Sequence, residues 1–123
     1  MVTVDGGEVA SFFADEPVGE QVYDEVVRLV DRAGPATVRV TKSQVAFRRR
    51  QGFCWLWRPA MYLRDPAAPV VVSVALPRRD EGNRWKQVVE VGGHWMHHLE
   101  VRDVAEVDRE VAAWLAEAYA CAG

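Results

Sequence analysis

The residues of this 123-residue chain that could do chemistry are mainly basic and aromatic side chains in its middle part. Residues 36–90 hold eleven Lys or Arg and four Asp or Glu, whereas residues 1–35 hold two Arg and eight Asp or Glu. Residues 91–123 are acidic again, with two Arg and six Asp or Glu. This separation of charge predicts a basic surface that can hold an anionic group through charge-assisted hydrogen bonds. The residues that we expect on this surface are Lys42, Arg48, Arg84 and Lys86, with Trp85 beside them and His97 or His98 completing the set.

The anionic partner is predicted to be a nucleotide, another small molecule or a nucleic acid, bound without catalysis. Basic residues interleaved with aromatic ones on a sheet are typical of modules that hold single strands, and Trp55, Trp57 and Trp85 could supply the stacking planes. In a second interpretation the face is merely solvated and charged, and the tryptophans are core. The net charge of −3 favours that second interpretation, because nucleic-acid-binding domains are usually basic.

His94, His97 and His98 would share one face of a helix and could then hold a metal ion. The flanking Gly92-Gly93 and the apolar residues that follow favour a strand instead, in which His97 and His98 point to opposite faces. There is no HExxH pattern and no nearby Cys, so we expect no metal and no other cofactor. One of these histidines is expected to be a hydrogen-bonded structural residue.

Catalysis has little support, because the chain has no GxSxG motif, no glycine-rich phosphate loop and no dinucleotide-binding fingerprint. Two alternatives to a binding domain stay open: a small enzyme with His97 or His98 as its acid–base group, and a homodimer or protein-interaction module. Cys54 and Cys121 lack metal or redox spacing, and no export signal precedes them, so free thiols in a cytoplasmic protein are expected. No apolar run approaches the roughly 20 residues of a membrane-spanning helix.

Periodicity predicts one α+β domain over residues 1–123, an antiparallel sheet of five or six strands with helices packed mainly on one face. Two helices are expected at the N terminus, over Gly7–Ala14 and Pro17–Ala33, and one at the C terminus over Val104–Ala120. Asp103 and Glu106 form a capping box for the last one. Phe53, Trp55 and Trp57 alternate on one face, which we expect to be the one covered by helices. The predicted strands are Thr37–Thr41, Gln44–Arg48, Phe53–Trp57, Val70–Leu76, Trp85–Val91 and Met96–Val101.

Four segments together resemble a bacterial family of domains of unknown function with a Thr-Lys-Ser/Thr-x-x-Ala-Phe motif and a Trp-x-His-His motif. They are Val40–Arg48, Arg84–Lys86, Trp95–Glu100 and Trp114–Tyr119. Such domains occur alone or at the C terminus of larger proteins, some of them nuclease-like, and a looser likeness is to small YdhG-like and YjbR-like α/β domains. The resemblance implies a fold and no activity. It marks Lys42, Ser43, Arg84, His97 and His98 as signature positions, and so adds Ser43 to the candidate ligand-binding residues.

Overall fold

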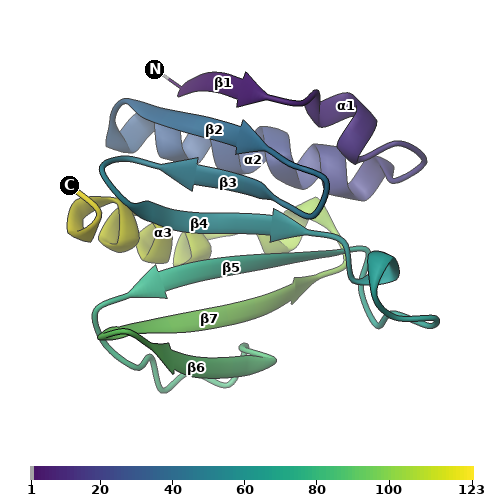
Figure 1. Ribbon diagram of the computed structural model, residues 1–123. Helices are drawn as coiled ribbons and strands as arrows, with labels where there is room; N and C mark the ends of the chain where they lie inside the picture. Colours follow the sequence, from purple (N-terminus) through teal and green to yellow (C-terminus); the bar gives the residue numbers. More distant parts are fainter. Residues whose placement is uncertain (1) are drawn as a thin grey trace.

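The computed structural model of the protein describes residues 2–123 and is shown in Figure 1. Within these residues the chain forms three α-helices and seven β-strands, joined in one sheet of order β1-β2-β3-β4-β5-β7-β6. The helices are α1 (Val9–Phe12), α2 (Pro17–Ala33) and α3 (Arg109–Cys121), and two short 3-10 turns are η1 (Pro59–Met61) and η2 (Val104–Glu106). The strands are β1 (Val2–Gly6), β2 (Ala36–Val40), β3 (Val45–Arg48), β4 (Gly52–Trp57), β5 (Val70–Leu76), β6 (Gln87–Val91) and β7 (His94–Val101).

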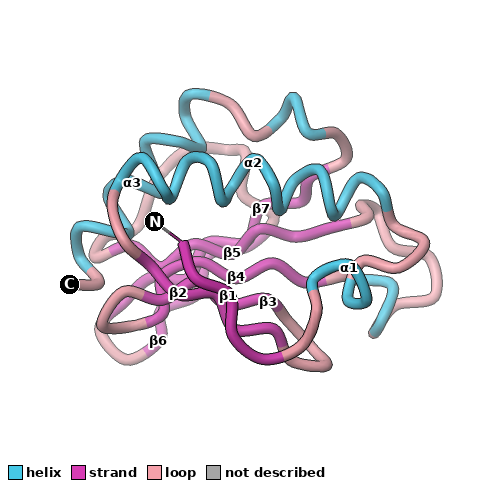
Figure 2. Tube along the Cα trace, turned by 90° about the horizontal axis from the view of Figure 1, so that it is seen from above, coloured by secondary structure: helices cyan, strands magenta, loops and turns pink. Residues whose placement is uncertain are grey.

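Helices α2 and α3 lie side by side on one face of the sheet, as Figure 2 shows. Each turns an apolar stripe to the strands, Val22, Val26 and Val30 from α2 and Val111 and Leu115 from α3, and all five side chains are buried. We call this covered side the helix face and the other side the open face. None of the helices within residues 2–123 is long and apolar enough to cross a bilayer.

The predicted α+β class and the covering of one face are confirmed, but an antiparallel sheet of five or six strands is wrong. Strand β1 was not predicted, and it pairs in parallel with β2, from Val2 opposite Ala36 to Gly6 opposite Val40. The pairing depends on the crossover through α1 and α2, which no local pattern announces. β1 is also an edge strand whose Val4 is half exposed, so it lacks the burial pattern that identifies inner strands.

The last helix begins five residues later than predicted. The capping box of Asp103 and Glu106 is present, but it closes the 3-10 turn η2 and not α3. The backbone leaves the helical region at Val107, and Asp108 then caps α3 by accepting a hydrogen bond from the Val111 N–H at 3.2 Å. Two capping residues lie five positions apart, and only the second of them begins an α-helix.

The prediction that Trp55 and Trp57 face the helices is wrong, because strand β4 carries a bulge. The pairing of β3 with β4 shifts between Phe47 and Arg48, so that Phe53 and Cys54 both enter the core. Such an insertion breaks the alternation of side chains. Trp55 therefore lies on the open face, in a row that continues across β5 and β7 through Ser73 and His98.

Gly19 in the first turn of α2 lets the Phe13 ring pack against the helix backbone. A Cβ atom at this position would overlap the Phe13 ring at its Cδ1 atom, and Phe13 is only 2% exposed. The same contact holds α1 in place, because Phe12 and Phe13 are neighbours whose rings meet edge to face at 4.9 Å. Gly19 therefore helps to position Phe12, which lines the cleft described below.

We expect Gly19→Ala to lower the free energy of unfolding by about 1–3 kcal/mol, the usual cost of overpacking. Alanine has the better helix propensity by about 1 kcal/mol, so an unhindered site would show the opposite sign. Urea denaturation measures the difference. Gly7→Ala is the control, since its Cβ would meet Val40 at an ordinary 3.5 Å. A stabilised Gly19→Ala protein would contradict this account of the α1–α2 contact.

Candidate functional site

The structure distributes the eight predicted site residues over separate parts of the molecule. Lys42 and Ser43 form the tip of the β2–β3 hairpin, whereas Arg48 lies at the opposite end of β3 and lines a different depression with Thr37 and Arg49. Lys86 and His98 lie on the open face. The remaining three, Arg84, Trp85 and His97, contact the helix side of the protein. The predicted gathering of these cations around one hollow is therefore wrong for Arg48 and Arg84.

Arg84 connects the loop before β6 to the start of α3. Its Nη1 donates to the carboxylates of Asp108 and Glu110 at 3.0 and 2.9 Å, and its Nη2 donates to the Glu106 carbonyl at 2.9 Å. The guanidinium carbon also lies 5.6 Å from the centroid of the Trp114 ring. These contacts neutralise the positive charge of Arg84 and give it a structural role.

His97 is entirely buried, and the backbone uses both of its ring nitrogens. Nε2 accepts the Asp80 N–H at 3.0 Å, so the proton resides on Nδ1, which donates to the Trp95 carbonyl at 2.9 Å. Trp85 covers the ring with a centroid separation of 4.8 Å. The expectation of one hydrogen-bonded structural histidine is confirmed at this position. His97 and His98 point to opposite faces of β7, and no metal-binding group of three His, Cys, Asp or Glu occurs in the described part of the chain.

The tip of the β2–β3 hairpin is closed by the Thr41 side chain. Its Oγ1 accepts the backbone N–H groups of Ser43 and Gln44 at 3.4 and 3.3 Å and donates to the Gln44 carbonyl at 3.2 Å. The Thr41 N–H donates to the same carbonyl at 2.9 Å. Because these bonds hold the two-residue loop, Lys42 and Ser43 contribute to two different depressions on either side of the tip.

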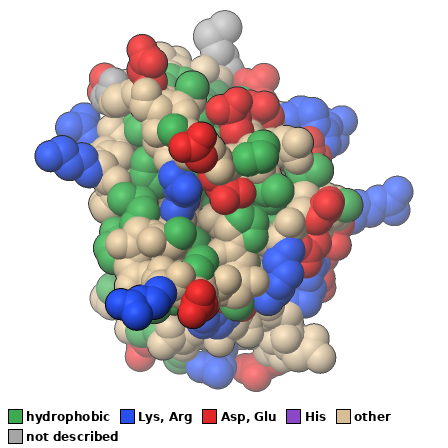
Figure 3. All heavy atoms as spheres, turned by 90° about the vertical axis from the view of Figure 1, so that its right-hand side faces the viewer, with side chains coloured by type: hydrophobic (Ala, Val, Ile, Leu, Met, Phe, Trp, Pro, Cys, Tyr) green, Lys and Arg blue, Asp and Glu red, His purple; other side chains and the backbone are tan. Residues whose placement is uncertain are grey.

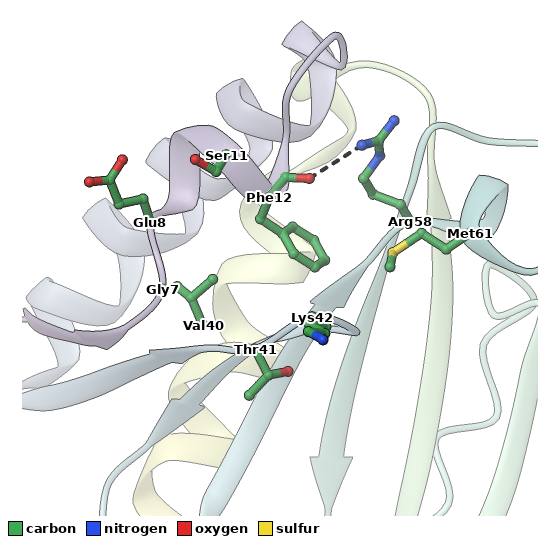
Figure 4. Close-up of a pocket in the computed structure, with 9 residues that line it drawn as sticks. All are labelled: Gly7, Glu8, Ser11, Phe12, Val40, Thr41, Lys42, Arg58 and Met61. Carbon is green, nitrogen blue, oxygen red and sulfur yellow. Dashed lines mark hydrogen bonds between the residues drawn. The ribbon is translucent and has the colours of Figure 1, made fainter.

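The first depression, which we call the Lys42–Arg58 cleft, has a volume of about 580 Å³. It lies between the hairpin tip, α1 and η1, and Figure 4 shows the Phe12 ring, Met61 and Lys42 around the same space. Its lining consists of Gly7, Glu8, Ser11, Phe12, Val40, Thr41, Lys42, Arg58 and Met61. Two cations and one carboxylate thus share the cleft, and the Glu8 carboxylate points away from both cations in Figure 4.

Arg58 is held at the edge of this cleft by backbone groups and not by a carboxylate. Its Nη1 donates to the carbonyls of Phe12 and Ala14 at 3.2 and 3.3 Å, and its Nε is buried and has no hydrogen-bond partner within residues 2–123. In the same range neither Arg58 nor Lys42 forms an ion pair. Sequence reasoning missed Arg58, because only the tertiary contact with the α1 region, more than forty residues away, places it in the lining of the cleft that Lys42 also lines.

The second depression, which we call the Trp57–His98 hollow, lies on the open face beside the hairpin tip. Its main part of about 600 Å³ is lined by Ser43, Gln44, Trp57, Tyr62, Leu63 and Lys86. Two smaller recesses of about 220 and 180 Å³ share Trp57 with it, and His98 lines both. Of the predicted residues, Ser43, Lys86 and His98 are thus brought together here. Lys86 is paired with Glu100 at 3.1 Å.

His98 is oriented by a chain of hydrogen bonds on the open face. The Trp57 indole N–H donates to Ser73 Oγ at 3.0 Å, and Ser73 Oγ lies 2.7 Å from His98 Nδ1. The buried Ser73 hydroxyl needs an acceptor for its own proton, and Nδ1 is the acceptor that these contacts offer it. The neutral imidazole therefore carries its proton on Nε2. Burial, and then the proximity of His97, lower the pKa of His98 below its ordinary value.

Cys54 does not complete a nucleophilic site with a histidine. It is fully buried on the helix face, where burial raises the pKa of its thiol. Cys54 lies opposite Val74, and Val74 lies opposite His97. Two strand spacings of about 4.8 Å each therefore separate β4, which carries the thiol, from β7, which carries the imidazole. That separation is beyond hydrogen-bond reach.

The comparison with protein families decides the membership of this chain. A family described as Domain of unknown function (DUF5655) matches residues 9–122. The chain belongs to the DUF5655 family. The predicted membership in a family of domains of unknown function is thereby confirmed, and this DUF5655 domain matches no curated protein and no solved structure.

Thiol titration tests the burial of Cys54 in this DUF5655 domain. We expect a disulfide reagent such as DTNB to modify one thiol in the native protein, because Cys121 is exposed and Cys54 is buried. Both thiols should react in urea. Cys121→Ser should leave no rapidly reacting thiol in the native state. Rapid reaction of that variant would show that Cys54 is accessible.

The lowered pKa of His98 predicts a pH dependence of stability. As the pH falls below about 6.5, the unfolded chain takes up a proton at this position before the folded DUF5655 domain does, so protonation favours unfolding. The free energy of unfolding should therefore decrease more for wild type than for His98→Gln between pH 7.5 and pH 5.5. Urea denaturation of both proteins at both pH values measures this. An equal decrease in both proteins would contradict the assignment.

Proposed function

We propose that this DUF5655 domain binds a small anionic ligand in the Lys42–Arg58 cleft and catalyses no reaction on it. The observation that carries the proposal is the pair of cations in this cleft that lack a carboxylate partner. Two of the cations expected at the site differ in this respect, since Arg84 and Lys86 are both neutralised by ion pairs. An unpaired Lys and Arg beside one cavity supply the charge-assisted donors that a phosphate or carboxylate group needs.

The Arg58 guanidinium is already oriented before a ligand arrives. The two backbone carbonyls on Nη1 hold its plane, so little side-chain entropy is lost when an oxyanion binds to the remaining N–H groups. Lys42 on the hairpin tip adds a mobile point charge from the other side of the cleft.

The surroundings of the cleft support a small ligand over a nucleic acid. α2 carries Glu20, Asp24 and Glu25 near its N-terminal half, and Figure 3 shows several acidic side chains among the basic ones at this end of the molecule. A polyanion needs a continuous basic track to replace its counterions. A single anionic group needs only the cleft.

The side chains that line the cleft are poorly arranged for catalysis. Among the lining residues there is no imidazole or thiol, the Glu8 carboxylate points away from both cations in Figure 4, and the Thr41 hydroxyl is committed to the hairpin tip. General acid–base chemistry requires such a group within hydrogen-bond reach of the reacting atoms. Binding is therefore the function that the arrangement supports best. We also propose a cytoplasmic location, because both cysteines are unpaired.

Titration with inorganic phosphate at low ionic strength tests the function. Amide signals of Gly7, Thr41 and Lys42 should shift in ¹H–¹⁵N NMR spectra, with sodium chloride at equal ionic strength as the blank. Lys42→Gln should weaken phosphate binding about fivefold, the effect of losing one charge-assisted hydrogen bond worth about 1 kcal/mol. Lys42 is exposed and forms no ion pair, so the variant should keep the stability of wild type.

Arg32→Gln is the matched control, because it removes one positive charge from the last turn of α2, away from the cleft. It should leave phosphate binding unchanged. If phosphate shifts none of these amides, or if Lys42→Gln and Arg32→Gln weaken binding equally, then the cleft is not the anion site.

A further inference from the structure

The Lys42–Arg58 cleft and the Trp57–His98 hollow adjoin along two short segments. Lys42 and Met61 line the cleft, and the next residue of each segment, Ser43 and Tyr62, lines the hollow. Adjacent residues are only about 3.8 Å apart between Cα atoms, so the two depressions are neighbours at the same end of the sheet. One ligand of moderate length can therefore reach into both.

The hollow has the walls of a site for a flat ring. The indole of Trp57 lines it and is held in place by the hydrogen bond that its N–H donates to Ser73. The Tyr62 ring stands at 67° to it with the centroids 6.1 Å apart, and Leu63 lies beside them. Aromatic walls of this kind bind planar groups by stacking and edge contacts.

The apolar walls of the hollow are uncovered in the free protein. Five large hydrophobic side chains are exposed within residues 2–123, and three of them are the consecutive Met61, Tyr62 and Leu63. Figure 3, which looks at this end of the molecule, shows hydrophobic side chains with a Lys or Arg among them. Exposed apolar residues that are grouped beside a cavity mark a binding surface, whereas isolated ones need no explanation.

Polar groups without partners complete the hollow. The side-chain amides of Gln44 and Gln87 and the Nε2–H of His98 form no hydrogen bond to any residue from 2 to 123. An amide offers both a donor and an acceptor, and the Nε2–H offers a donor. A ring with nitrogen and carbonyl groups along its edge matches this set, whereas a plain hydrocarbon ring would leave it unsatisfied.

We propose that the Trp57–His98 hollow holds a planar heteroaromatic ring whose attached anionic group occupies the Lys42–Arg58 cleft, so that the ligand is a nucleoside monophosphate. This proposal rests on the proposed anion-binding function and specifies its ligand class. The phosphate contacts Lys42 and Arg58, the sugar crosses the line between the hairpin tip and η1, and the base packs on Trp57.

The test compares five probes by isothermal titration calorimetry: inorganic phosphate, adenosine, uridine, AMP and UMP. At least one of the nucleotides should bind at least about fivefold more tightly than phosphate, because base–aromatic stacking contributes about 1–3 kcal/mol. Tyr62→Ala should remove most of this advantage and leave phosphate binding unchanged. Tyr62 is 62% exposed, so its truncation should not unfold the protein. Val91→Ala, at an exposed position at the end of β6, is the matched control and should change neither affinity.

The outcomes separate this inference from the function on which it rests. If phosphate binds through Lys42 but neither nucleotide binds more tightly, the ring site is wrong and the anion site stands. If phosphate does not bind, the anion site fails, and the nucleotide proposal fails with it even where a nucleoside binds. Equal losses of nucleotide affinity in Tyr62→Ala and Val91→Ala would also overturn the ring site.

Discussion

The hydrogen bonds of the Thr41 hydroxyl are the constraint on which both proposed sites depend. A two-residue hairpin loop has few conformations. Thr41 holds this one because its hydroxyl bonds both the backbone N–H and the carbonyl of Gln44. Lys42 then contributes to the Lys42–Arg58 cleft, and Ser43 contributes to the Trp57–His98 hollow. Because the loop joins two inner strands of the sheet, the sheet itself holds the backbone that carries both side chains. A binding site on such a support needs little reorganisation.

The basic residues in the middle of the chain have two different roles in the folded protein. Arg84 pairs with Asp108, the N-cap residue of α3, and Arg78 pairs with Glu117 within α3, so that both fasten the β5–β6 loop to the helix layer. These cations serve stability. Lys42 and Arg58 have no carboxylate partner in the described chain, so their positive charges are free to bind an anion. The same composition thus supplies both structural ion pairs and a candidate anion site, and only the positions of the carboxylates distinguish the two.

Local patterns predicted most elements of the fold and few contacts of the site. The bounds of α2 and β5 agree with prediction, because strong periodicity and uninterrupted burial fixed them. β1 was missed because it is a short edge strand whose partner follows two helices later. The faces of Trp55 and Trp57 were assigned wrongly because a bulge shifts the alternation by one residue. A bulge depends on how two strands pair, so the sequence of one strand does not reveal it.

The sequence by itself determined that this is an α+β domain with a basic middle, a structural histidine and strands around Lys42, since period, charge and turn residues are local properties. Tertiary structure alone decided which backbone groups bind the His97 ring, that Arg84 is neutralised, and that Arg58 lines the same cleft as Lys42. The physical reason is the short range of the interactions that fix these contacts. Hydrogen bonds and ion pairs act over a few ångströms, and the chain brings their partners together only when the sheet and helices have packed.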